Sequence, residues 1–497
     1  MKGYIIGIDI GTGSTKAVAL NPEGEIIGST QQSYLYIKSD GFKEEQDPGD
    51  LLNAFFSCIK NLIIQMKQLP MCVSLSSAMH SIMAVDKNGQ PITNLIVWSD
   101  NRSTQIAQKL RNNKTGQSIY LATGTPIHAM SPLCKIIWWR ENDTEVFTKA
   151  HKFISIKEYV WHRLFNEYTV DHSIASATGL FNIDSLKWNP ESLQISHISA
   201  EQLSTPVPTD HYKTGILKEA CQLSGLTDSI PVYIGASDGC LANLGSNALK
   251  TGVAAITIGT SGAVRIASAS PIRNVRTMSF NYILDSQHFI CGGPINNGGN
   301  VIGWLIQNFL DNEERDVDPY SMIFEMIQQI PAGSEGLIFL PYIFAERAPV
   351  WDEESSGVFI GIRNVHTKAH FICAIIEGIC YALKNVLELI EAASCEVKEI
   401  HASGGFIKSE GWVQLLADVT GKPVVIIETE DASAIGAAIL AYRSLEMIGD
   451  KNEAKHESRI VIPREEFTIE YSKYFRVYKT IYPKLQESMH LLYETTN

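Results

Sequence analysis

Two carboxylates adjoin runs of small residues that follow apolar, strand-like segments. Asp9 lies in Ile8-Asp9-Ile10-Gly11-Thr12-Gly13-Ser14, and Asp238 lies in Gly235-Ala236-Ser237-Asp238-Gly239. A carboxylate beside a phosphate-binding turn is typical of a site where Mg²⁺ lies between the two, because this ion keeps much of its water shell. A carboxylate at a strand end can also accept the proton of an attacking hydroxyl during phosphoryl transfer. We therefore expect Asp9 to serve a metal ion, and Asp238 to contact the metal and the acceptor as the catalytic base.

Both carboxylates also have a purely structural interpretation. Asp9 could belong to an ordinary strand that ends in a tight turn. Asp238 could be the N-cap of the helix predicted after it, since Asp is favoured at that position. On these residues alone the alternatives stay open.

The phrase around Asp9 recurs in the second half of the chain. Ile256-Thr257-Ile258-Gly259-Thr260-Ser261-Gly262 lies roughly 248 residues after the first copy, which indicates two similar halves. Turns of Gly, Thr and Ser expose backbone N–H groups to an anion. The turns are neither Walker A loops nor Rossmann fingerprints, because no Gly-x-x-x-x-Gly-Lys-Ser/Thr occurs and Lys16 replaces the third glycine. We expect the two hairpins to bind one nucleotide in a cleft, through these residues: Gly11, Thr12, Gly13, Ser14, Lys16, Gly259 and Thr260.

The elements that must position these turns alternate between strands and helices. Strands are predicted at Tyr4–Ile8, Ala17–Leu20, Cys72–Leu75 and Glu399–Ala402, and helices at Leu51–Met66 and Phe371–Ala393. This alternation favours α/β architecture. With 497 residues the chain exceeds one ordinary core. The small-residue stretch Leu244–Gly252 is the predicted boundary, which gives domains of residues 1–246 and 247–497.

Composition narrows the classes of partner. The net charge of −13 argues against nucleic acid, because phosphate neutralisation needs a basic face. The nine cysteines are scattered without a zinc-type spacing, and no apolar run is long enough for a membrane span. We expect a cytoplasmic protein that binds small molecules and neither nucleic acid nor membrane.

Two longer segments carry a family resemblance. Gly357-Val358-Phe359-Ile360-Gly361-Ile362, followed after seven residues by His370-Phe371-Ile372-Cys373-Ala374-Ile375-Ile376-Glu377, resembles the C-terminal signature of the FGGY carbohydrate kinases. Met130-Ser131-Pro132-Leu133-Cys134-Lys135-Ile136-Ile137-Trp138 resembles their other signature, although Trp139 stands where an aliphatic residue or Phe is usual. The resemblance implies two actin-like (ribonuclease H-like) domains that close on ATP–Mg²⁺ and a sugar.

The resemblance also implies roles for individual residues. Asp9 matches the metal-linked acid of the first phosphate motif, and Asp238 matches the catalytic base. Gly404 and Gly405 match the adenosine motif, and Ser409 stands where some relatives have Asn. Gly299 and Asn300 are expected to edge the nucleotide site.

Polyol recognition needs hydrogen-bonding groups beside an aromatic ring, and two segments supply them. We expect sugar contacts from His80, Trp98, Asp100 and Arg102, and a further one from Asp171. The alternatives are a buried core histidine, a surface ion pair between Asp100 and Arg102, and a helix N-cap at Asp171.

Within the family, Met79-His80-Ser81 and Trp98-Ser99-Asp100-Asn101-Arg102-Ser103 are closer to gluconate kinases than to xylulose kinases. We therefore expect an ATP-dependent kinase that converts gluconate to 6-phosphogluconate, with Arg102 suited to the carboxylate. Xylulokinase is the alternative sugar assignment. An actin-like ATPase switch without an acceptor is the alternative from another class. The resemblance also suggests a homodimer.

Overall fold

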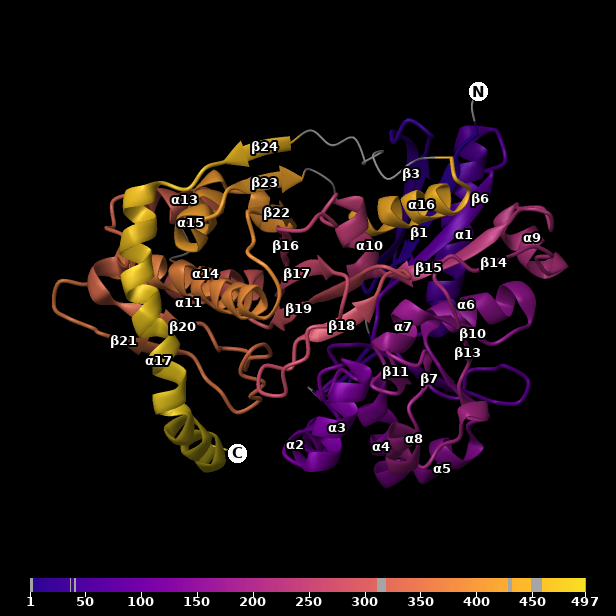
Figure 1. Ribbon diagram of the computed structural model, residues 1–497, viewed down its shortest axis with the longest axis horizontal. Helices are drawn as coiled ribbons and strands as arrows, with labels where there is room; N and C mark the ends of the chain where they lie inside the picture. Colours follow the sequence, from indigo (N-terminus) through magenta and orange to yellow (C-terminus); the bar gives the residue numbers. More distant parts are fainter. Residues whose placement is uncertain are drawn as a thin grey trace. The chain divides into compact units, whose positions relative to one another are not determined.

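The computed structural model describes residues 3–35, 37–39, 42–310, 319–427, 431–447 and 458–496. Contacts divide the chain into two compact units. The first comprises Met1–Leu249, Ala267–Cys291 and Asp431–Lys455, and the second comprises Lys250–Ile266, Gly292–Glu430 and His456–Asn497. Both contain a mixed sheet with helices packed against it (Figure 1).

The first unit is built on a six-stranded sheet in the order β14-β15-β6-β1-β2-β3. In that order the strands are Tyr212–Lys213, Val232–Ser237, Cys72–Ser77, Ile5–Ile10, Ser14–Leu20 and Ile26–Ser33. β1 and β2 form an antiparallel hairpin, whereas β6 runs parallel to both β1 and β15. The carboxyl ends of β1, β6 and β15 therefore lie at one edge of the sheet.

The main sheet of the second unit repeats this pattern. Its strands follow the order β19-β17-β16-β22-β23-β24. Their bounds are Phe289–Ile295, Gly262–Ser268, Val253–Ile258, Glu399–Ser403, Val424–Ile427 and Ser458–Val461. β16 and β17 form the antiparallel hairpin, and β22 runs parallel to both β16 and β23. The α/β prediction and the prediction of two similar halves, each opening on a hairpin, are confirmed.

The remaining elements cover these sheets and extend the first unit. Its helices are α1 (Pro48–Met66), α2 (Thr104–Arg111), α3 (Lys114–Thr123), α4 (Pro132–Asn142), α5 (Thr144–Lys149), α6 (Ile156–Phe165), α7 (His172–Ser176), α8 (Pro190–Ser196), η1 (Ala200–Gln202), α9 (Lys218–Ser224), α10 (Asp238–Gly245) and α16 (Ala432–Ser444). Its shorter strands are β4 (Ile37–Ser39), β5 (Lys43–Gln46), β7 (Met83–Val85), β8 (Leu95–Ile96), β9 (Lys152–Ile154), β10 (Thr169–Asp171), β11 (Phe181–Asn182), β12 (Lys187–Trp188), β13 (Thr205–Val207) and β18 (Phe280–Ile283). The second unit adds β20 (Ile338–Leu340), β21 (Val358–Ile360), α11 (Gly299–Phe309), α13 (Pro319–Ile327), η2 (Ser334–Gly336), α14 (Lys368–Ala393), η3 (Gly405–Lys408), α15 (Glu410–Thr420) and α17 (Glu465–Thr496).

Helix boundaries follow local capping signals. α1 begins earlier than predicted because Asp47 caps it and Pro48 occupies its first position, where a missing N–H costs nothing. α14 begins before Phe371 because Thr367 and His370 form a capping box.

Helix α16 packs against β1 and α10 within the first unit, although it lies near the end of the sequence. Glycines allow the close approach. A Cβ at Gly7 would lie 1.9 Å from the carbonyl oxygen of Ala434, and one at Gly436 would lie 2.0 Å from that of Leu241. The compact units thus differ from a single cut after residue 246, and the predicted domains 1–246 and 247–497 stay a prediction.

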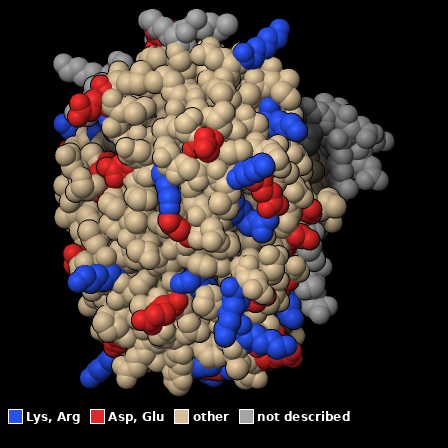
Figure 2. All heavy atoms as spheres, turned by 90° about the vertical axis from the view of Figure 1, so that its right-hand side faces the viewer, with Lys and Arg blue, Asp and Glu red and all other residues tan. Residues whose placement is uncertain are grey.

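Charged side chains of both signs are interspersed on the face drawn in Figure 2. This mixture differs from the concentrated basic area that binds a polyanion. No described helix combines the length and apolar character that crossing a bilayer needs.

Glu377 provides a pH-sensitive contribution to stability inside the second unit. Its carboxylate accepts hydrogen bonds from Gly333 N (2.8 Å) and Ser334 Oγ (2.9 Å), and burial raises its pKa from 4.5 to about 7. Because the folded state holds this proton more tightly, stability falls as pH rises from 4.5 to 7 and then levels off. We expect Glu377→Gln to remove that decline. The free energy of unfolding of the variant, relative to that of wild type, should therefore rise by roughly 3 kcal/mol from pH 5 to pH 8.

Urea unfolding of both proteins at pH 5 and pH 8 measures this difference. Glu396→Gln is the matched control, because Glu396 follows the same helix and is exposed. Equal pH dependence in wild type and Glu377→Gln would show that the pKa of Glu377 is the same in the folded and unfolded states.

Candidate active site

The first hairpin turn is fixed by contacts from three directions. Gly11 N donates to Ser14 O (3.1 Å) across the turn. Gln46 Nε2 donates to Thr12 O (2.6 Å), and Trp98 Nε1 donates to Thr12 Oγ1 (3.2 Å). The ring predicted to face the sugar is therefore bonded to the predicted phosphate turn, so the two sets of residues are adjacent in the first unit.

Asp9 and Asp238 lie at the carboxyl ends of parallel strands of the same sheet. Asp9 lies near the carboxyl end of β1, Asp238 follows β15, and β6 runs parallel to both strands between them. Burial, and then the charge of Asp238, raise the pKa of Asp9 to about 7, although Ser76 Oγ donates to Asp9 Oδ1 (2.6 Å) and opposes the shift. The structure thus brings together the two carboxylates that the sequence predicted as a pair.

This pair fits a hydrated divalent cation. Two close carboxylates repel each other, and a cation of charge +2 would relieve that repulsion. Within the described ranges no group of three or more His, Cys, Asp or Glu residues is placed to hold a metal. One or two carboxylates completed by water and phosphate oxygens are the usual ligand set of Mg²⁺.

Asp238 is the first residue of α10 and remains partly exposed. The N-cap position belongs to Ser237, so the N-cap alternative for Asp238 is wrong. Asp238 Oδ1 accepts from Gly239 N (2.7 Å), and Ser433 Oγ donates to Asp238 O (3.1 Å). The carboxylate is therefore oriented by the start of its own helix.

Asp171 is buried behind this edge. Its Oδ1 accepts from Ile174 N (2.9 Å) at the start of α7, and its Oδ2 lies 2.8 Å from Lys157 Nζ. The same ammonium donates to Ala236 O (2.8 Å), just before Ser237 and Asp238. The N-cap alternative for Asp171 is thus realised, and its sugar contact stays a prediction.

His80 has a left-handed backbone, with φ of 65°. Its Nδ1 lies 2.7 Å from Ala177 O, and its Nε2 lies 3.0 Å from Tyr282 OH. Because a carbonyl can only accept, Nδ1 carries the proton and Nε2 accepts from the tyrosine. This is the bonding expected of a buried core histidine, and the sugar contact of His80 stays a prediction.

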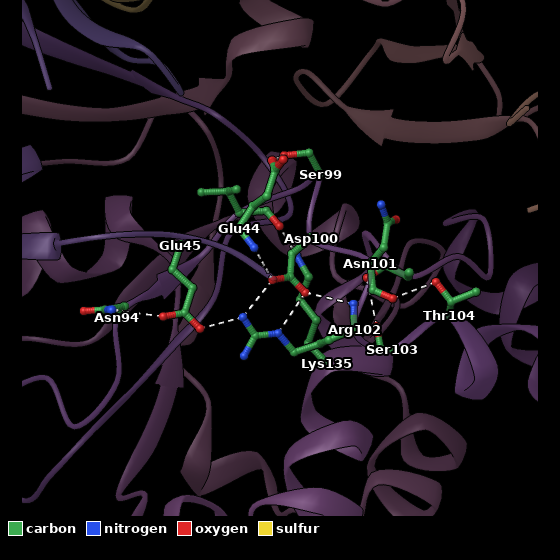
Figure 3. A network of polar contacts seen from close by, with 12 residues as sticks. Glu44, Glu45, Asn94, Ser99, Asp100, Asn101, Arg102, Ser103, Thr104 and Lys135 are labelled. Carbon is green, nitrogen blue, oxygen red and sulfur yellow. Dashed lines mark hydrogen bonds and ion pairs between the residues drawn. The ribbon is translucent and has the colours of Figure 1, made fainter. Parts of the chain in front are cut away.

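Asp100 and Arg102 form a buried, bidentate pair (Figure 3). Arg102 Nε donates to Asp100 Oδ1 (2.8 Å), and Arg102 Nη2 donates to Asp100 Oδ2 (2.7 Å) and Glu45 Oε1 (2.5 Å). The guanidinium also lies 5.1 Å from the ring centroid of Trp138. The alternative of a surface ion pair is therefore wrong. One edge of Arg102 is committed to Asp100 rather than open to a ligand.

The second unit contains a cavity of about 800 Å³ beside its own hairpin. Six predicted nucleotide residues share its wall: Gly259, Thr260, Gly299, Asn300, Gly405 and Ser409. Gly404 lies behind them, where a Cβ would come within 2.4 Å of Ile258 O. The volume is in the range typical of ligand pockets.

The second hairpin is joined to the start of α11. Gly299 N donates to Gly259 O (2.8 Å), and Asn300 N donates to Thr260 O (3.1 Å). Glu346 supports this junction, since its carboxylate accepts from Asn296 N (2.6 Å) and Asn297 Nδ2 (3.0 Å).

Several residues of the cavity wall were not predicted from the sequence. They are Phe324, Glu325, Gln328, Phe406, Lys408, Glu410, Gly411 and Trp412. The segment Phe406–Trp412 immediately follows the glycine pair, and its aromatic and basic residues were the available signal. Phe324 and Glu325 come from α13 and Gln328 directly follows it, and this segment has no such marker.

Comparisons with known proteins agree with this arrangement. The N-terminal domain of the FGGY family of carbohydrate kinases matches residues 4–245, and its C-terminal domain matches residues 254–445. A gluconokinase of Bacillus licheniformis is 39% identical over 95% of this chain and 94% of its own length. Two Lactobacillus acidophilus structures are similar throughout: a gluconate kinase (TM-score 0.92, 34% identity, 97% and 98% coverage) and a ligand-bound xylulose kinase (TM-score 0.93, 33% identity, 99% and 100% coverage).

Proposed function

Because the chain belongs to the FGGY family of carbohydrate kinases, we propose that it transfers the γ-phosphate of ATP to the terminal hydroxyl of gluconate. The products would be 6-phosphogluconate and ADP. The observation that carries the choice of gluconate is the near full-length similarity to a gluconokinase. The two Lactobacillus acidophilus structures are matched almost equally, so overall fold does not separate gluconate from xylulose.

The proposed chemistry assigns proton transfer to Asp238. Its carboxylate accepts the proton of the terminal hydroxyl while that oxygen attacks the γ-phosphorus. The bond from phosphorus to the bridging oxygen of ADP breaks, and the released charge stays on ADP. The partial exposure of Asp238 and its fixed position at the start of α10 support this role.

The proposed nucleotide site uses groups from both hairpins. Gly11 N and Gly259 N donate within their own turns, to Ser14 O and Ser261 O. The other backbone N–H groups of the two turns would bind phosphate oxygens, with Lys16 adding positive charge. The cavity beside Gly405 and Ser409 would hold the adenosine. Asp9 and Asp238 would hold Mg²⁺, which when bound supplies charge neutralisation at the phosphates.

The proposed sugar site lies beside the first hairpin. Trp98 supports this assignment, because it is bonded to Thr12. The neighbouring loops carry His80, Asp100 and Arg102. The contacts of these side chains within the protein favour a role in orienting the loops over direct contact with the sugar. Asp171 would act indirectly, by holding Lys157, which donates to Ala236 O just before Asp238.

The test is ADP release by the purified protein with ATP and Mg²⁺. The acceptors are gluconate, xylulose, ribulose, glycerol and none. Strong release with gluconate alone is expected. Release with xylulose instead would favour the xylulokinase alternative, and release independent of any acceptor would favour the ATPase switch.

Two further expectations concern the protein in the cell and in solution. Since the reaction consumes ATP, we expect it in the cytoplasm. Light scattering would test the predicted homodimer.

A further inference from the structure

Lys135 is a buried cation that the proposed chemistry does not use. It lies on α4 with none of its surface exposed. Its ammonium donates to His80 O (2.9 Å) and to Val97 O (2.7 Å). Both acceptors are backbone carbonyls from loops that carry predicted sugar residues.

The charged groups around Lys135 form a small network (Figure 3). Asp100 is the nearby anion, and Arg102 is a nearby cation that Asp100 and Glu45 neutralise. Burial lowers the pKa of Lys135 to about 7, the charge of Asp100 opposes this shift, and that of Arg102 adds to it. Burying an ammonium is costly, so its two short bonds to carbonyls must be maintained for the fold to retain it.

The bonds from Lys135 to His80 O and Val97 O hold the backbones of two loops in place. His80 has a left-handed backbone, which is uncommon for a residue other than glycine and needs support from its surroundings. Val97 directly precedes Trp98, whose indole reaches Thr12 on the first hairpin. One ammonium therefore fixes the separation of the His80 loop and the Trp98 loop.

We propose that Lys135 is a positioning residue that holds the His80 and Trp98 loops at the separation that receives the sugar. This inference rests on the proposed function, since it takes those loops as the sugar site. Lys135 touches neither the sugar nor the nucleotide in this proposal. Its effect should therefore appear in sugar affinity and leave nucleotide affinity unchanged.

The decisive variant is Lys135→Met, which keeps an unbranched side chain of similar length and removes all three donors. We expect the KM for the sugar to rise by about tenfold or more, because binding depends on preformed geometry. The KM for ATP should stay within about twofold of wild type, since the nucleotide cavity belongs to other residues. Lys135→Gln, which retains an amide donor, should give an intermediate KM for the sugar.

Lys384→Met is the matched control. Lys384 is also a buried lysine that donates to a backbone carbonyl, Val419 O (2.7 Å), but it lies on α14 in the second unit. Loss of stability should be common to both methionine variants, whereas the rise in sugar KM should be confined to Lys135→Met. Thermal unfolding of each variant measures the stability change separately.

Three outcomes would overturn the inference. One is an unchanged sugar KM in both Lys135 variants. The others are an equal rise in the KM values for sugar and ATP in Lys135→Met, and an equal rise in the sugar KM of Lys384→Met, because a general loss of structure would explain either. If Lys135→Met does not fold, the sugar KM of Lys135→Gln decides alone. The acceptor is whichever sugar supports turnover, so failure of the gluconate assignment leaves this comparison intact. A wild type with no sugar acceptor would refute both proposals.

Discussion

Asp238→Asn is expected to lower kcat by roughly 10²–10⁴-fold, because the amide cannot accept the proton of the attacking hydroxyl. The substitution is nearly isosteric, and the Oδ1 that accepts from Gly239 N can be retained. ATP affinity should fall far less than turnover, because Asp9 and the other groups proposed to bind Mg²⁺ and the phosphates are unchanged. Acceptor-dependent ADP release measures turnover. Isothermal titration calorimetry measures ATP binding.

A matched control is Asp210→Asn. Asp210 is an exposed carboxylate of the same unit, so its loss removes an equal charge from a different place. We expect wild-type turnover from that variant. Near-normal turnover in Asp238→Asn would contradict the assignment of the base. Loss of ATP binding in parallel with turnover would show that Asp238 acts through the metal ion and the nucleotide alone, and would contradict its role in proton transfer.

The hairpins and the strands at Cys72–Leu75 and Glu399–Ala402 could be predicted from the sequence because each of these features is local. A β-branched run ending in Gly, Thr and Ser specifies a strand and its turn within a few residues. The packing of α16 on β1 could not be predicted in this way. It depends on Gly7, which lets the backbone of β1 approach Ala434 of α16. The packing of α16 on α10 depends in the same way on Gly436, which lies close to Leu241. Neither glycine is marked by its sequence neighbours, because its partner is far away in the chain.

In the candidate site, the types of the side chains could be predicted from the sequence, but their orientations could not. The sequence identified Asp100 and Arg102 as groups able to bind a polyol, but their side chains pair with each other inside the protein. His80 likewise directs both ring nitrogens to Ala177 and Tyr282. Orientation depends on partners such as Glu45 and Tyr282, and spacing along the chain carries no information about them.

Lys157→Met is expected to lower the free energy of unfolding by about 3–5 kcal/mol, because it leaves one member of a buried ion pair without its partner. Lys157 Nζ lies 2.8 Å from Asp171 Oδ2, and neither side chain is more than 1% exposed. The variant also loses the bond to Ala236 O, which anchors the strand end before Asp238. In addition, Lys157 lowers the pKa of Asp9, so its removal should make Asp9 harder to ionise. Urea unfolding and acceptor-dependent turnover measure the two effects.

The double variant Lys157→Met with Asp171→Asn separates charge from packing. Asparagine is also a favoured N-cap, so it can keep the bond from Ile174 N while removing the uncompensated charge. We expect the double variant to recover most of the lost stability but little of the turnover, because the contact with Ala236 O is still missing. If Lys157→Met alone is as stable as wild type, Asp171 must take up a proton at little cost when its partner is lost. If the double variant recovers full turnover, the charge of Asp171 alone, rather than the anchored strand end, governs the position of Asp238.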